Sequence, residues 1–337
     1  MRSNKRLQAQ ITTGRITLPV VILLSIGCWI AGSIMFPNLK AGQSLFPTGY
    51  NSGLWNLPQW IESLLSLLLY AVAGYSLIAL NNLFGFIRMR ASVQTSVYFI
   101  LVAICPFIHK LYAGNIASAF LIVAFYFLFK SYQQIHSSGV LFYTFFFIGT
   151  GSLFFPQLTF FIPIFWIGAY NLQSLSLKSF FASVIGYTLP YWFLFGHAYF
   201  YSDMQLFYAP FQELVTFYPI DYIKDVPTWT FATLGYLFLI YTISSVHCIM
   251  AGYEDRIQTR VYLHFLIFLN FCFFIYIILQ PIQSIQVLPL LLIGVSILTG
   301  HLFVLTSSKT SNLFFIFAIA CLAGLFGFNI WMLLFNS

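Results

Sequence analysis

Three histidines are the side chains of this sequence best suited to bind a metal ion. His247, His264 and His301 each lie near the end of an apolar stretch, and imidazole is the commonest metal ligand in proteins. The patterns that usually enclose a metal are missing, because no carboxylate stands at ligand spacing and no two of these histidines are four residues apart. We interpret all three as amphipathic residues at a membrane boundary, with a metal or haem site as the weaker alternative. The sequence predicts no cofactor.

Carboxylates, which could act as general acids or bases, are scarce. The chain has seven Asp and Glu among 337 residues. Five fall on one predicted side of a membrane: Glu62, Asp203, Glu213, Asp221 and Asp225. The other two, Glu254 and Asp255, stand beside Arg256 and Arg260, so local ion pairing explains them.

The composition requires a membrane protein. Hydrophobic residues make up 60% of the chain and charged residues only 6%, against roughly 25% charged residues in an average soluble domain. Cytoplasmic enzymes, nucleic-acid-binding modules and disordered scaffolds are therefore excluded. The net charge of +7 comes from residues scattered among loops and indicates no nucleic-acid partner. The five cysteines lie in apolar runs, where we expect no disulfide.

Apolar runs of suitable length predict an all-α, polytopic transmembrane bundle of about eleven spans in a single domain, residues 1–337. The first span follows a basic tail, residues 1–15, and is typical of an uncleaved signal anchor. The hairpin of 139–155 and 158–170 either spans twice or is re-entrant. The predicted spans are 16–36, 61–80, 92–108, 115–129, 139–155, 158–170, 180–196, 229–250, 262–280, 286–305 and 312–334.

The basic residues predict the orientation, because Lys and Arg in short loops collect on the cytoplasmic side. Only Lys40, Lys110 and Lys224 fall outside if the N-terminus is cytoplasmic and the C-terminus external. The other eleven of the 14 fall inside: Arg2, Lys5, Arg6, Arg15, Arg88, Arg90, Lys130, Lys178, Arg256, Arg260 and Lys309. We therefore expect an integral inner-membrane protein.

The longest external loop, residues 197–228, carries aromatic and acidic side chains together. Phe207, Phe211, Leu214 and Tyr218 recur at helical spacing, which predicts a short interfacial helix, started or interrupted near Pro210. Such a loop either caps the bundle or holds a sugar or an isoprenoid phosphate carrier. The candidate substrate contacts on this side are Lys110, His197 and Glu213.

Inside the predicted spans, uncharged residues give two further signals. Ala320, Gly324 and Gly327 place small side chains on one face of the last span, which favours close packing with another helix or with a second membrane protein. Asn270 indicates an interhelical hydrogen bond or, alternatively, the polar cavity of a carrier. No charged residue lies near the middle of a span, which disfavours an ion-coupled transporter.

The segment from Phe147 to Tyr201 carries a family resemblance. It reads F-I-G-T-G-S-L-F-F-P-Q-L-T-F-F-I-P-I-F-W-I-G-A-Y, then S-L-K-S-F-F-A-S-V-I-G-Y-T-L-P-Y-W-F. This resembles a family of uncharacterised polytopic membrane proteins from Bacteroidota, and the resemblance implies an envelope membrane protein of unassigned activity. The residues that carry it are Gly149, Gly151, Pro156, Pro163, Lys178, Gly186 and Pro190.

The short hairpins and the large external loop also resemble, more distantly, the C-type glycosyltransferases that use polyprenyl-phosphate sugars. That family places an acidic residue in the first external loop, but this chain has no Asp or Glu between Pro37 and Trp60. If the chain is a transferase, the resemblance implies that Lys110 contacts the phosphate. The catalytic candidates would be Glu62, Asp203, Asp221 and Asp225.

Three functions remain open. The absence of a convergent catalytic set favours a non-catalytic component of cell-envelope assembly or lipid handling, whose partners are membrane lipid and an isoprenoid lipid carrier. The first alternative is a glycosyltransferase that uses a lipid-linked sugar on the outer face. The second is a carrier or flippase.

Overall fold

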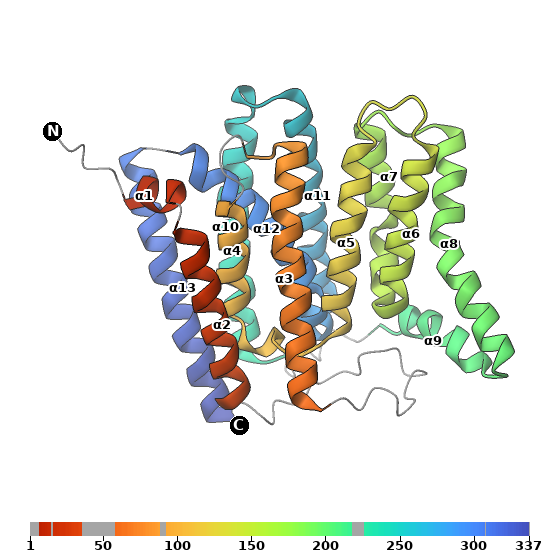
Figure 1. The fold of residues 1–337 in the computed structure, drawn as a ribbon, viewed down its shortest axis with the longest axis horizontal. Helices are drawn as coiled ribbons and strands as arrows, with labels where there is room; N and C mark the ends of the chain where they lie inside the picture. Colours follow the sequence, from red (N-terminus) through yellow and green to blue (C-terminus); the bar gives the residue numbers. More distant parts are fainter. Residues whose placement is uncertain are drawn as a thin grey trace.

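A computed structural model describes residues 7–14, 16–35, 58–87, 92–217, 226–306 and 308–336. Within these ranges the chain is an all-α bundle without β-strands (Figure 1). The α-helices are α1 (Leu7–Thr13), α2 (Thr17–Met35), α3 (Gln59–Phe84), α4 (Ser92–Ala103), α5 (Ala113–Lys130), α6 (Ser138–Phe154), α7 (Ile162–Asn171), α8 (Leu177–Phe200), α9 (Met204–Val215), α10 (Thr228–Met250), α11 (Ile257–Leu279), α12 (Ser284–Leu305) and α13 (Lys309–Asn336). Short 3-10 turns are η2 (Pro106–Ile108), η3 (Pro156–Phe161), η5 (Gly252–Glu254) and η6 (Pro281–Gln283).

Each predicted apolar stretch contains a helix, which confirms the polytopic helical bundle. Six helical segments of the described ranges are long and apolar enough to cross a membrane: Trp60–Phe84, Ala113–Lys130, Thr228–Met250, Ile257–Leu279, Pro281–Leu305 and Lys309–Phe335. Thr17–Gly32, Ser92–Ala103 and Ser138–Phe154 are shorter apolar helices. The count of about eleven spans therefore stays a prediction.

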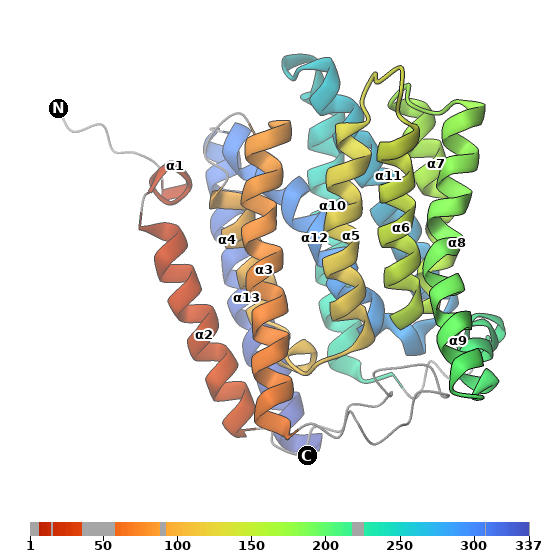
Figure 2. The same cartoon turned by 45° about the vertical axis from the view of Figure 1, so that its right-hand side comes forward.

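The bundle has two ends, which we call the α1 end and the α9 end (Figures 1 and 2). At the α1 end, the Gln8 amide donates to the carbonyl oxygen of Phe303 at 2.8 Å, which fixes α1 beside the end of α12. The turns after α5 and α7 meet there too, where the Gln133 N–H donates to the Leu172 oxygen. Because η3 contacts α9, the hairpin α6–η3–α7 runs the length of the bundle and returns.

Helix α12 forms the centre of the bundle, where it packs against α4, α5, α10 and α11. Almost every side chain from Ser284 to Phe303 is buried. Small residues allow this crowding, because a Cβ at Gly294 would collide with the Asn270 amide. That amide donates to the Leu266 oxygen of its own helix at 2.7 Å. The predicted interhelical hydrogen bond of Asn270 is therefore wrong, since glycine leaves room for the amide to fold back.

Lys and Arg residues are distributed unequally between the two ends of the bundle. Of the Lys and Arg residues whose positions are described, only Lys110 belongs to the α9 end. Those at the α1 end are Lys130, Lys178, Arg256, Arg260 and Lys309. The other basic residues used for the orientation lie outside the described residues: Arg2, Lys5, Arg6, Arg15, Lys40, Arg88, Arg90 and Lys224.

The predicted interfacial helix of the long loop is confirmed as α9. It begins at Met204 and continues through Pro210, so the predicted start or break at this proline is wrong. The helix is held by aromatic contacts, because the Phe207 ring lies 5.3 Å from that of Phe195 and the Phe211 ring lies 5.3 Å from that of Tyr191. Tyr218 lies outside the described residues.

The small residues of α13 face outwards. Ala320, Gly324 and Gly327 are exposed, and a Cβ added at either glycine would meet no atom within 4 Å. This face is therefore not used for packing within the described part of the chain.

Candidate functional site

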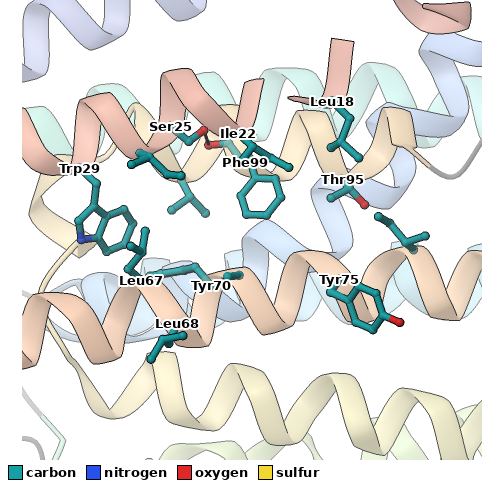
Figure 3. A pocket seen from close by; sticks show the side chains of 14 residues that line it. Leu18, Ile22, Ser25, Trp29, Leu67, Leu68, Tyr70, Tyr75, Thr95 and Phe99 are labelled. Atoms are coloured by element: carbon teal, nitrogen blue, oxygen red, sulfur yellow. Dashed lines mark hydrogen bonds between the residues drawn. The ribbon is translucent and has the colours of Figure 1, made fainter. Parts of the chain in front are cut away.

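A lateral groove separates α2 from α3. Helix α2 packs along α4 and contacts α3 sparingly, which leaves a cavity of about 310 Å³. Figure 3 shows side chains of α2 and α3 facing each other across this space, with side chains of α4 between them. The lining includes Leu18, Ile22, Trp29, Leu67, Tyr70 and Phe99.

The walls of this groove are mainly apolar, although the hydroxyl groups of a serine and a threonine lie in them beside two tyrosines. The Ser25 hydroxyl donates to the Phe99 carbonyl oxygen at 3.2 Å, and the Thr95 hydroxyl donates to the Gly74 oxygen at 3.3 Å. Both donors are therefore satisfied by backbone. A ligand that enters the groove meets mainly hydrocarbon and aromatic surface.

The groove is about as long as one membrane leaflet is thick, and it opens sideways. Its lining runs along α3 from Leu67 to Ile78, a length of about 16 Å in a helix, against about 15 Å for half of the hydrocarbon core. Leu68 and Tyr75 line it and are 52% and 73% exposed. In a bilayer this exposed edge faces lipid chains.

The groove is closed towards the α9 end by a buried polar network. The Trp29 indole stacks on the His109 ring at 3.8 Å and donates to the Ser63 oxygen at 3.2 Å. His109 donates from Nε2 to the Val102 oxygen at 3.1 Å. Burial lowers the pKa of His109 to about 4, against the opposing effect of the Val102 hydrogen bond. The imidazole that closes the groove is therefore neutral at physiological pH.

A charged pair lies just beyond this closure. Glu62 and Lys110 interact electrostatically: burial lowers the pKa of the Lys110 ammonium, and the Glu62 charge opposes this effect. Burial, together with the Glu62 charge, raises the pKa of Tyr112 to about 12. Glu62 is one helical turn from Ser66 on α3, about 6 Å along the axis.

Hydrogen bonds fix the backbone of Lys110, whose side chain carries the positive charge. The Asn115 amide donates to the Lys110 carbonyl oxygen at 2.8 Å, and the Ser66 hydroxyl donates to the same oxygen at 3.2 Å. Tyr70, which lines the groove, donates to the Asn115 side-chain oxygen at 3.0 Å. The apolar groove and its charged head are thus joined by one hydrogen-bond network.

The structure brings only part of the sequence-predicted site together. Glu62 and Lys110 are close, whereas α9 and the end of α8 lie on the opposite side of the bundle from α2 in both views (Figures 1 and 2). His197 and Asp203 lie there and are exposed. Asp221 and Asp225 lie outside the described residues.

Glu213 belongs to a separate polar cluster on α9. The carboxyl group is partly buried near Gln157 of η3. Burial raises the pKa of Glu213, and the Gln157 amide opposes this by favouring the ionised form. Because this cluster is not continuous with the α2–α3 groove, Glu213 is not a contact for a ligand bound there.

Of the three histidines considered as metal ligands, two lie close together and the third lies apart. His247 and His301 have ring centroids 5.8 Å apart, while His264 is exposed on α11. Sequence reasoning missed two neighbours of this pair, Cys248 and Asp255. Asp255 contacts His301 at 2.9 Å, so local pairing with arginine is an incomplete explanation for this carboxylate. The contact joins residues that do not stand at ligand spacing in the sequence. The signal available in the sequence was the adjacency of His247 and Cys248.

A second cavity, of about 440 Å³, lies on another side of α2. Its walls come from α1, α2, α4, α10, α12 and α13, and include Ile11, Val20, Ile100, Ile240 and Phe315. This cavity is also apolar. Like the lining of the α2–α3 groove, its lining contains no charged residue.

Comparison with known proteins gives no relative. No family model matches the chain, and neither a curated protein nor a solved structure matches it. The chain's function is therefore inferred from its own residues.

Proposed function

We propose that this protein is a non-catalytic lipid-handling component of the inner membrane, which holds one chain of an anionic lipid in the α2–α3 groove. The observation that carries the proposal is the apolar lateral cavity with Glu62 and Lys110 beyond its closed end. A catalytic reaction would need further groups at this head. Glu62 is the only carboxylate there among the described residues.

The physics of a bilayer assigns separate roles to the groove and its head. Lipid chains are as apolar as the groove walls, so transfer of a chain into the groove gains little hydrophobic free energy. Filling the space restores dispersion contacts that an empty groove would forfeit. Selectivity must therefore come from the headgroup, and the Lys110 ammonium favours a phosphate. An isoprenoid phosphate carrier combines both features.

The unequal distribution of basic residues supports the proposed orientation. Lys130, Lys178, Arg256, Arg260 and Lys309 lie at the α1 end, which we assign to the cytoplasm because Lys and Arg are retained there during insertion. The groove head near Lys110 then faces the outer side, with the C-terminus.

Co-purifying lipid tests the proposal. The protein and its Ala71→Trp variant, which fills the groove, are purified in mild detergent, and bound lipid is extracted and identified by mass spectrometry. The matched control is Ile185→Trp, at an exposed site of α8. We expect wild type and control to retain an anionic lipid and the groove variant to lose most of it. Equal retention by all three proteins would contradict the proposal.

A lipid-linked sugar transferase remains the second proposal, supported by the proximity of Glu62 and Lys110. In that case Glu62 would accept a proton from an acceptor hydroxyl. Substitution Glu62→Gln should then abolish envelope glycan transfer and leave bound lipid unchanged. Normal glycan with normal protein abundance would contradict the transferase.

The carrier or flippase stays a prediction of the sequence. Both cavities described above are apolar, which favours lipid chains over polar solutes.

A further inference from the structure

Three potential metal ligands converge at the α1 end of the bundle, far along the membrane normal from the groove head. His247 and Cys248 belong to the last turn of α10, and His301 belongs to α12. One donor atom from each lies within 4.8 Å of the other two. Cys248 Sγ is 3.4 Å from His301 Nδ1. Ligands from two helices therefore already surround one point.

Asp255 orients His301 for such a role. Its Oδ2 atom is 2.9 Å from His301 Nε2, and both side chains are buried. An ionised carboxylate can only accept a hydrogen bond, so His301 Nε2 carries the hydrogen and Nδ1 keeps its lone pair towards Cys248. Histidines that bind metals usually donate their second ring N–H to a carboxylate or carbonyl in this way, which fixes the tautomer and raises ligand basicity.

The environment suits a borderline-soft cation. Two imidazoles and a thiolate are the donors that zinc prefers, and three protein ligands leave a fourth position for water. Cys248 and His301 are buried, whereas His247 is only half-buried, which gives an ion access from the α1 end. His264 is exposed elsewhere on α11 and does not join the group.

We propose that His247, Cys248 and His301 bind a zinc-class transition metal, and that Asp255 is a positioning residue for His301. Binding converts the Cys248 thiol into a metal thiolate and releases its proton to solvent, so affinity falls as the pH falls. The site joins the end of α10 to α12. It is independent of the lipid groove, since the two share no residue.

The test uses the full-length protein, freed of metal by a chelator and then titrated with Zn²⁺ or Co²⁺. We expect one ion per chain, and for Co²⁺ a thiolate-to-metal charge-transfer absorption. Cys248→Ser should abolish this absorption. Asp255→Asn should keep it and weaken binding about 10- to 100-fold. The matched controls are Cys321→Ser on α13 and His264→Gln on α11, which should bind as wild type does.

A purely structural Asp255–His301 pair makes a different prediction. Wild type and Cys248→Ser would then elute as equally folded protein in size-exclusion chromatography, and both would bind the same amount of Zn²⁺. That result would overturn the proposal. The cysteine variant decides the question because it leaves the buried His301–Asp255 contact intact, whereas loss of His301 could prevent folding. Loss of the Co²⁺ absorption in the Cys321→Ser control would also count against the assigned ligand.

Discussion

The interface of α6 with α8 and the gap between α2 and α3 show two ways of placing neighbouring helices in this bundle. A Cβ at Gly149 would lie 2.5 Å from the Tyr187 oxygen, and one at Gly186 would collide with the Phe142 oxygen, so these two backbones touch. Between α2 and α3 lie large side chains such as Trp29 of α2 and Phe99 of α4, and a cavity remains beside them.

The difference shows that the separation of α2 from α3 is specified by residue choice. Helix α2 also contains a glycine, Gly27, but a Cβ there would meet no atom within 4 Å. Glycine therefore produces close approach only where a facing backbone is positioned for it. The α2–α3 gap persists as a cavity that a lipid chain can fill.

The largest loss of stability is expected from Gly186→Leu. The added side chain cannot occupy the space of the Phe142 carbonyl, so α6 and α8 must separate, at a cost of about 3 kcal/mol or more. Fluorescence-detected size-exclusion chromatography measures the loss of folded protein. The matched control is Gly196→Leu on the same helix, where a Cβ would meet no atom within 4 Å. A stable Gly186→Leu protein would break the comparison.

The closed end of the groove should make stability depend on pH through His109. Its pKa is about 4 when folded, against 6.5 ordinarily, so the unfolded chain binds the proton more readily. The free energy of unfolding should be highest above pH 6.5 and fall by about 3 kcal/mol as the pH falls towards 4. Thermal unfolding of wild type and His109→Gln measures this loss.

The free energy of unfolding of wild type and that of His109→Gln must depend differently on pH across this range. If His109→Gln loses stability as steeply as wild type, a neutral histidine behind Trp29 is not the cause. His264→Gln, at an exposed site, serves as the control and should follow wild type throughout.

Removal of the cation should alter which lipid is held and leave occupancy of the groove unchanged. One Lys near a membrane surface contributes about 1 kcal/mol towards an anionic headgroup, or about five-fold in preference. Lys110→Gln should therefore lower the ratio of anionic to zwitterionic co-purified lipid by that factor. Lys178→Gln, at the exposed start of α8, should leave the ratio unchanged, and equal ratios in all proteins would contradict the role of Lys110.

The smallest effect is expected from Ser25→Ala. The hydroxyl hydrogen bond to the Phe99 oxygen is lost, while that oxygen also belongs to the α4 helix, so the change in stability should be about 1 kcal/mol or less. The groove becomes slightly more apolar, and thermal unfolding with lipid analysis should show retained lipid. Loss of lipid would show that the hydroxyl contacts the ligand.

The sequence predicted the helices well because long apolar runs have no other stable form in a bilayer. The spacing of Phe207, Phe211 and Leu214 likewise predicted α9. Helix neighbours were harder to infer, since hydropathy does not state which helix packs beside which. The contact of Asp255 with His301 joins residues 46 positions apart, and the proximity of Glu62 and Lys110 depends on how α3 meets the start of α5. Both required the three-dimensional arrangement.

Site-specific photo-crosslinking in the native membrane tests the central claim most directly. A photoreactive amino acid replaces Ile22 in the groove or, for comparison, Ile185 on the exposed face of α8. We predict that position 22 captures a restricted, anionic set of lipids, that this set shifts with Lys110→Gln, and that position 185 captures the bulk lipid mixture. The same bulk mixture at both positions, unchanged by Lys110→Gln, would contradict the account.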